Sequence, residues 1–170
     1  ILQSHIGGAF LFIGSGFSRR YLNLEDWEGL LTKFCNTGKS FKYYKSSADG
    51  NLAKAAELLA NDFHEVWWKD NSYISNREKY ESFSKDTTSA LRIEISHYLK
   101  NLNNKINKEY QNEINALENL NIDGIITTNW DMFLENIFPD YEVYIGQQEL
   151  LFSNPQEVGE IYKIHGSASN

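Results

Sequence analysis

Three short polar motifs in this chain of 170 residues have the composition of a nucleotide-handling site. The first is Gly14–Ser18 (GSGFS), followed by Arg19. Paired glycines after a strand let backbone N–H groups approach a phosphate, which a helix N-terminus also attracts. The spacing is neither GxGxxG nor a P-loop, because no GK[ST] follows. Taken alone, the motif fits a plain strand-to-helix turn as well as a phosphate cradle.

The second motif is Thr127–Asp131 (TTNWD), which places an amide and a carboxylate after an apolar run. These groups could contact a polar ligand. They could equally cap a helix, with Thr128 or Asn129 accepting from first-turn amides and Asp131 favouring the helix dipole. Taken alone, this motif favours the capping interpretation.

The third motif is His165, followed by glycine. A neutral imidazole can take a proton from a sugar hydroxyl or a water near physiological pH. For a single histidine, hydrogen bonding to the backbone near the core is the commoner role. His5, His64 and His97 show no ligand spacing with one another or with Cys35, so we expect no metal site.

Apolar runs and helical periodicity predict the elements that position these motifs. The strands are expected at 9–13, 123–128, 142–145 and 160–164. Helices are expected at 25–36, 51–68 (with Asn51 as its N-cap), 87–102, 107–120 and 130–138. The run 9–13 has the composition of a strand buried on both faces, and 38–50 that of a polar loop.

Short apolar strands separated by helices predict an α/β fold, a Rossmann-like parallel sheet flanked by helices. A helical insertion of about residues 38–120 would lie between the first and second core strands. Each polar motif follows a strand. Ligands of such sheets bind beyond the carboxyl ends of the strands, so the three motifs should converge there.

Charge and composition exclude several classes of function. The net charge is −7, and no Lys or Arg lies between Lys108 and Lys163, so direct nucleic-acid binding by this segment is not expected. No apolar run approaches the ~18 residues of a membrane span, so no membrane partner is expected. A single cysteine, Cys35, indicates a reducing compartment, and we expect a cytoplasmic location.

In this order, the motifs resemble the sirtuin-like (SIR2) family, in its bacterial branch of antiviral NAD-hydrolysing proteins. GSGFS at 14–18 is similar to the family's GAG-x-S turn, and TTNWD at 127–131 to its T-x-N-x-D segment. KIHGS at 163–167 is similar to its histidine–glycine motif, and WEGLL at 27–31 to the W-x-x-L-L helix of the defence branch. The similarity runs from about residue 8 to the end, although 38–120 matches only as helices.

The resemblance implies an NAD+ site and a role for each matching residue. Asn129 would hold the ribose or position the attacking water, and His165 would be the general base. Trp130 and Asp131 would border the nicotinamide pocket. The remaining cofactor-binding residues, which include those that cradle the pyrophosphate, would be Gly14, Ser15, Gly16, Phe17, Ser18, Arg19 and Thr128.

The resemblance also implies a reaction, in which NAD+ is hydrolysed to nicotinamide and ADP-ribose as the effector of an abortive-infection system. Deacylating sirtuins carry a zinc ribbon of paired cysteines and a proline-bearing G-I-P-D-F-R segment, and this chain has neither. Two alternatives stay open: an NAD+ or ADP-ribose sensor or assembly module without turnover, and a sirtuin-type protein deacylase.

The resemblance further implies that residues 1–170 are a SIR2-like domain of a longer chain. The glycine-rich elements that contact adenosine in the family would follow Asn170, so the domain is expected to be incomplete at its C-terminus. An effector that depletes NAD+ must be held inactive. We therefore expect a homo-oligomer, an activating protein partner or an additional domain.

Overall fold

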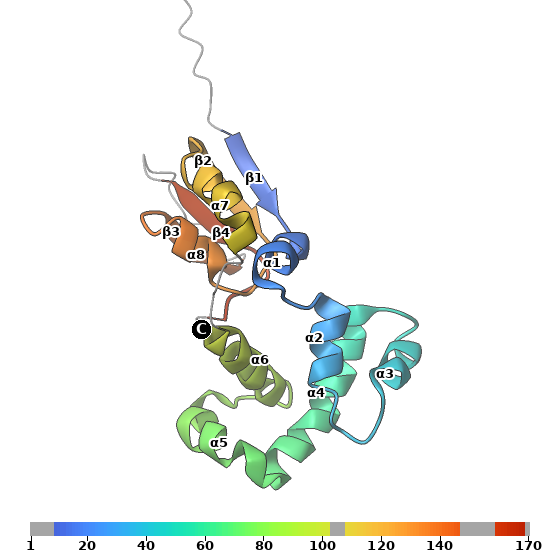
Figure 1. Cartoon of the computed structure of the whole chain (residues 1–170). Coiled ribbons are helices and arrows are strands. Elements are labelled where there is room, and N and C mark those ends of the chain that lie inside the picture. Colours follow the sequence, from blue (N-terminus) through green and yellow to red (C-terminus); the bar gives the residue numbers. More distant parts are fainter. Residues whose placement is uncertain (1–8, 103–107, 147–158, 169–170) are drawn as a thin grey trace, which may run out of the picture. The chain divides into compact units, whose positions relative to one another are not determined.

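The computed structural model describes residues 9–102, 108–146 and 159–168 (Figure 1). The chain forms two compact units. The sheet unit contains the residues up to Leu24 and those from Leu99 onward, and the helical unit contains Glu25–Tyr98. Within the described ranges, no helix is both long and apolar enough to cross a membrane.

The sheet unit is built on four parallel strands, which confirms the predicted α/β, Rossmann-like fold class. They are β1 (Ala9–Ile13), β2 (Ile122–Thr127), β3 (Glu142–Ile145) and β4 (Glu160–Lys163). Their order in the sheet is β1-β2-β4-β3. Each predicted strand is present, with boundaries that agree to within one residue. The carboxyl ends of β1, β2 and β4 therefore lie side by side, as the convergence of the motifs requires.

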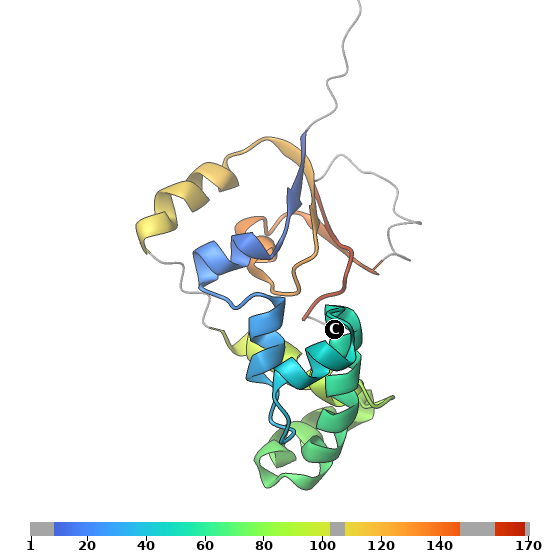
Figure 2. The ribbon, with the colours of Figure 1, turned by 90° about the vertical axis from the view of Figure 1, so that its right-hand side faces the viewer.

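One face of the sheet forms the core of this unit. Three helices cover it: α1 (Ser15–Leu22), α7 (Gln111–Glu118) and α8 (Phe133–Ile137). Figure 2 shows α1 and α7 on the same side of the strands. Ile13, Ile125 and Ile161 point from the strands into this core. They pack with Ile114 of α7 and Phe133 of α8, and burial of each such side chain contributes ~1.5–3 kcal/mol.

The prediction that strand 9–13 is buried on both faces is wrong. β1 is an edge strand that pairs only with β2 among the described strands. On the face opposite the core, Phe10 is 51% exposed and Phe12 is 69% exposed. Phe10 lies over Gly124, where a side chain would collide with its ring, and stacks on Tyr162 with ring centroids 6.4 Å apart. A continuous apolar run thus does not distinguish an edge strand from a central one.

The helical unit lies between β1 and β2 in the sequence, which confirms a helical insertion at this point of the fold. Its elements are α2 (Trp27–Lys33), α3 (Phe41–Ser47), α4 (Leu52–Lys69), η1 (Asn71–Tyr73), α5 (Ile74–Tyr80), η2 (Glu81–Phe83) and α6 (Ser89–Asn101, whose last residues belong to the sheet unit). A short turn, η3 (Lys108–Tyr110), precedes α7. α7 falls inside the predicted insertion range but packs against the sheet.

The predicted helices differ from the observed ones mainly at their ends. α4 and α6 agree with prediction to within two residues, and Asn51 caps α4 by accepting from the Lys54 N–H at 3.1 Å. α2, α7 and α8 are shorter than expected. The prediction of a polar loop at 38–50 is wrong, because α3 buries Phe41 and Tyr44, one turn apart, on one helix face.

Candidate functional site

The first motif joins the end of β1 to the start of α1. Gly14 is the N-cap of α1, and its carbonyl accepts from the Phe17 N–H at 3.0 Å. The helix therefore begins inside the motif, at Ser15, rather than after it. No described side chain caps this helix N-terminus, and both Ser15 and Gly16 are exposed. Their backbone amides in the first turn are positioned as a phosphate cradle requires.

The described part of the chain gives no reason for a glycine at position 16. Among the described residues, a Cβ placed there would meet no atom within 4 Å beyond its chain neighbours and its own helix backbone, and its φ lies outside the left-handed region. Alanine is favoured over glycine within helices, so the fold alone would favour a larger residue here. The space beside Gly16 is open for the close approach of another molecule.

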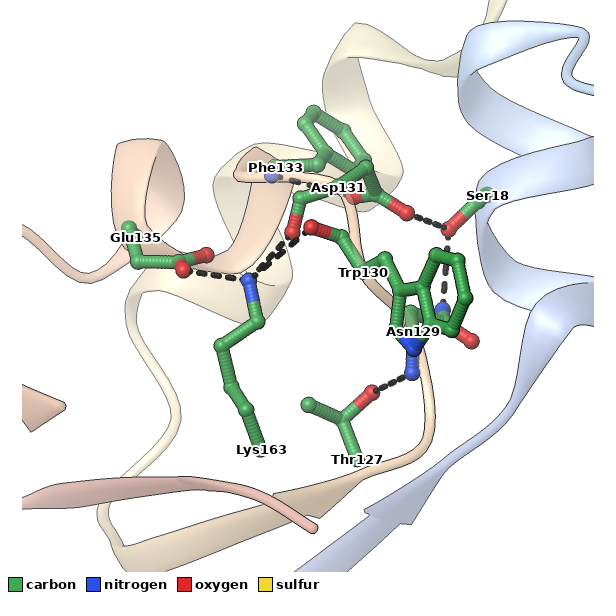
Figure 3. Close-up of polar contacts among 8 residues, drawn as sticks. All are labelled: Ser18, Thr127, Asn129, Trp130, Asp131, Phe133, Glu135 and Lys163. Carbon is green, nitrogen blue, oxygen red and sulfur yellow. Dashed lines mark hydrogen bonds and ion pairs between the residues drawn. The ribbon is translucent and has the colours of Figure 1, made fainter. Parts of the chain in front are cut away.

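The first two motifs are joined by a chain of buried hydrogen bonds (Figure 3). The Ser18 hydroxyl donates to Asp131 Oδ2 at 2.6 Å. The Asn129 amide donates to Ser18 Oγ at 2.8 Å and to the Gly14 carbonyl at 3.0 Å. Ser18, Asn129 and Asp131 are each less than 9% exposed. Side chains more than 100 residues apart in sequence thus meet at the carboxyl ends of β1 and β2.

The direction of these hydrogen bonds fixes the orientation of the Asn129 side chain. A carboxylate only accepts, so the single hydroxyl hydrogen of Ser18 is committed to Asp131. Ser18 Oγ and the Gly14 carbonyl can then only accept, and both donors must come from Asn129 Nδ2. The carbonyl oxygen Oδ1 of Asn129 points away from Ser18 and Asp131 (Figure 3), and no described residue donates to it.

Of the capping interpretation of the second motif, only the placement of Asp131 beside the start of the following helix is confirmed. Its Oδ1 accepts from the N–H of Phe133, the first residue of α8, at 3.1 Å, while its Oδ2 accepts from Ser18. Thr128 and Asn129 do not cap this helix in the described part of the chain. Thr127, which is fully buried, accepts instead from the Asn129 N–H at 3.0 Å. One carboxylate therefore serves both the helix and the polar chain.

The third motif joins the site through backbone groups. His165 follows β4 in a turn, and its carbonyl accepts from Trp130 Nε1 at 2.8 Å. The Ala168 N–H donates to the Trp130 carbonyl, also at 2.8 Å. The His165 side chain is exposed and has no hydrogen-bond partner among the described residues. The structure brings the three motifs together, but it does not bring the imidazole into the chain formed by Ser18, Asn129 and Asp131.

The other predicted site residues have varied surroundings. The Phe17 side chain packs into the core against Phe133, with ring centroids 5.6 Å apart, and therefore faces away from solvent. Thr128 is half-buried, and its N–H donates to the Ile13 carbonyl at 3.3 Å. Arg19 is exposed on α1. The neighbouring Arg20 forms two hydrogen bonds to Glu113, at 2.6 and 3.0 Å, and is committed to that carboxylate.

Three buried or nearly buried residues of the site had no predicted role: Thr127 and Lys163, which lie within the motifs, and Glu135, which lies outside them. Lys163 ends β4, is 1% exposed, and its ammonium contacts Glu135 and two backbone carbonyls of the second motif. A signal for Lys163 was available: it is the first basic residue after Lys108 and stands inside the apolar run EIYKI. A lysine in such a strand must find buried partners.

Searches of known protein-family models and of curated proteins find no match to this chain. Membership of the SIR2 family therefore stays a prediction from the sequence motifs alone.

Proposed function

We propose that this chain binds NAD+ and hydrolyses it to nicotinamide and ADP-ribose. One observation carries the proposal: the Asn129 amide is held by Ser18 and Gly14, and no residue in the described ranges donates to its Oδ1. This oxygen lies at the carboxyl ends of parallel strands, where ligands of such sheets bind. An acceptor fixed in this way is suited to a ribose hydroxyl or to an attacking water.

The chemistry requires little from the protein beyond positioning and electrostatics. Cleavage of the bond between nicotinamide and ribose develops positive charge on the sugar, and nicotinamide leaves as a neutral molecule. Water adds its oxygen to the ribose carbon and releases one proton. Asn129 Oδ1 would accept a hydrogen bond from the ribose or the water, and the Asp131 carboxylate would contribute a favourable field. His165 would receive a proton, which requires its exposed imidazole to face the bound substrate.

The pyrophosphate would lie at the N-terminus of α1. The exposed backbone amides of Ser15 and Gly16 supply donors, and the helix supplies partial positive charge. The open space beside Gly16 supports this placement. Arg19, exposed on the same helix, is the nearest basic side chain in sequence and would balance the negative charge of the phosphates.

An assay of NAD+ turnover tests the proposal directly. The protein, with any partner that co-purifies, is incubated with NAD+ while nicotinamide and ADP-ribose are followed by chromatography. We expect product from the wild type and from Asn112→Ala, a control at an exposed asparagine on α7, but none from Asn129→Ala. Equal turnover by Asn129→Ala and wild type would remove Asn129 from the site. Absence of both turnover and NAD+ binding in the wild type would refute the proposal.

A second candidate is an NAD+ or ADP-ribose sensor without turnover, which the exposed and unbonded imidazole of His165 favours. The substitution His165→Ala distinguishes the two functions, because only the hydrolase loses an activity. If His165 is the base, this variant keeps its NAD+ affinity by calorimetry and loses turnover. A wild type that binds NAD+ and forms no product supports the sensor.

The wider role proposed here follows the resemblance alone. A SIR2-like domain of a bacterial antiviral effector would be restrained until an oligomer or a partner protein activates it. The activity assay therefore includes the natural full-length protein and its co-purifying partners. Deacylation of proteins is disfavoured, because the chain has one cysteine and so cannot form a zinc ribbon of paired cysteines.

A further inference from the structure

Lys163 is a buried cation that the proposed reaction does not use. Its Nζ lies 2.6 Å from Glu135 Oε1, 2.5 Å from the Asp131 carbonyl and 3.4 Å from the Trp130 carbonyl (Figure 3). Its side chain is 1% exposed. All three acceptors belong to the segment that follows Asn129, and two of them are backbone carbonyls.

A charged residue at this position has a substantial cost. Removing an ammonium from water is unfavourable by several kcal/mol, even when a carboxylate partly offsets it. Lys163 shares its sheet face with Ile161, so an apolar residue would suit the packing. The ammonium instead makes contacts that an apolar side chain cannot make: two with the loop between β2 and α8, and one with Glu135 of α8.

The loop contacts determine where Asp131 points. The carbonyls of Trp130 and Asp131 belong to the peptide groups on either side of Asp131, so fixing both restrains its backbone dihedrals. The restrained Asp131 side chain receives the Ser18 hydroxyl, and Ser18 in turn receives the Asn129 amide. A shift of Asp131 would therefore release Asn129 from its fixed orientation.

We propose that Lys163 is a positioning residue: it holds the loop between β2 and α8 so that Asn129 Oδ1 is directed at the substrate. The part that concerns catalysis rests on the proposed function. The part that concerns Asn129 does not, because the orientation of its amide can be measured without NAD+.

The test removes the cation without leaving an unbalanced buried charge. Lys163→Met alone would leave Glu135, whose Oε2 already has no partner among the described residues, as an unpaired buried carboxylate. The variant is therefore Lys163→Met/Glu135→Leu, since apolar replacement of both partners is often neutral for stability. Lys69→Met/Glu65→Leu, which removes an exposed i,i+4 pair, is the matched control.

Two readouts are compared between wild type and variants. The first is hydrogen exchange of the Asn129 side-chain amide by NMR, which we expect to become at least about tenfold faster in the test variant. The second is NAD+ turnover, in which we expect kcat to fall at least about tenfold with KM nearly unchanged. The control variant should match the wild type in both readouts.

A folded test variant with wild-type Asn129 exchange would overturn the proposal and reduce Lys163 to a structural residue. If the wild type turns over no NAD+, the proposed function fails, and the exchange readout still decides the role of Lys163. Lys163→Gln/Glu135→Gln, which retains polar groups without either charge, replaces the test variant if that variant does not fold. The same outcomes then apply.

Discussion

The sharpest test of the buried polar chain is the removal of one hydroxyl, Ser18→Ala. Ser18 donates to Asp131 at 2.6 Å and accepts from Asn129 at 2.8 Å, and it is 4% exposed. The substitution leaves one carboxylate oxygen and one amide hydrogen without their partner. Each unsatisfied buried polar group costs roughly 1–3 kcal/mol, so we expect a loss of about 2–6 kcal/mol in the free energy of unfolding.

That loss is large compared with the total free energy of unfolding of a typical domain, which is about 5–15 kcal/mol. It is measured by urea unfolding followed by tryptophan fluorescence. The matched control is Ser15→Ala, which removes the same group from an exposed position on the same helix. Surface substitutions of this kind change stability by less than about 0.5 kcal/mol. A double-mutant cycle with Asp131→Ala isolates the coupling between Ser18 and Asp131, for which we expect about 0.5–3 kcal/mol.

A Ser18→Ala variant as stable as Ser15→Ala would refute the reasoning. The Ser18 hydroxyl would then not connect Asp131 to Asn129 in solution. The orientation of Asn129 Oδ1 depends on that connection, so the proposed role of Asn129 would lose its structural support at the same time.

Two further perturbations separate fold from ligand binding and test the helical unit. Gly16→Ala should stabilise the protein by up to about 1 kcal/mol in urea unfolding, because none of the described residues on other elements opposes the added methyl. It should also weaken NAD+ binding by calorimetry, and unchanged affinity would place the pyrophosphate elsewhere. In the helical unit, burial, together with the hydrogen bond to the Asp62 carboxylate, raises the pKa of Tyr44 to about 12. The folded state thus holds this proton more tightly than the unfolded state, whose tyrosine pKa is about 10. The resulting stability is complete below pH 10 and is lost as the pH rises towards 12. Tyr44→Phe should remove this alkaline loss and one late step in phenolate absorbance, whereas an unchanged titration would contradict the raised pKa of Tyr44.

Local patterns predicted the strands well, because each is a short apolar run bounded by polar residues. They failed where the environment is set by distant parts of the chain. The run 9–13 resembles a central strand, yet β1 is at the edge and exposes Phe12. The segment 38–50 is rich in polar residues, and its helix α3 becomes apparent only through the burial of Phe41 and Tyr44.

In the candidate site too, local sequence predicted some features, and contacts with distant residues decided the others. Parallel strands predicted that motifs at their carboxyl ends would meet, and the bonds between Ser18, Asn129 and Asp131 agree with that expectation. The sequence could not show which side-chain atom of Asn129 faces Ser18 and Gly14. That choice depends on the hydroxyl of Ser18, which is 111 residues away in sequence. It likewise gave no reason to expect an exposed His165 side chain joined to the site only through its backbone.

Asp131 shows why capping and function were never exclusive interpretations of the second motif. One of its oxygens caps α8 and the other receives Ser18, so its removal would harm both the fold and any activity. A loss of function in an Asp131 variant therefore cannot distinguish the two. Gly16 can make that distinction, because nothing in the part of the fold that the structure describes requires a glycine there. A residue that the fold does not need and that a ligand does need is the stronger evidence for a site, and Gly16→Ala measures both requirements in one variant.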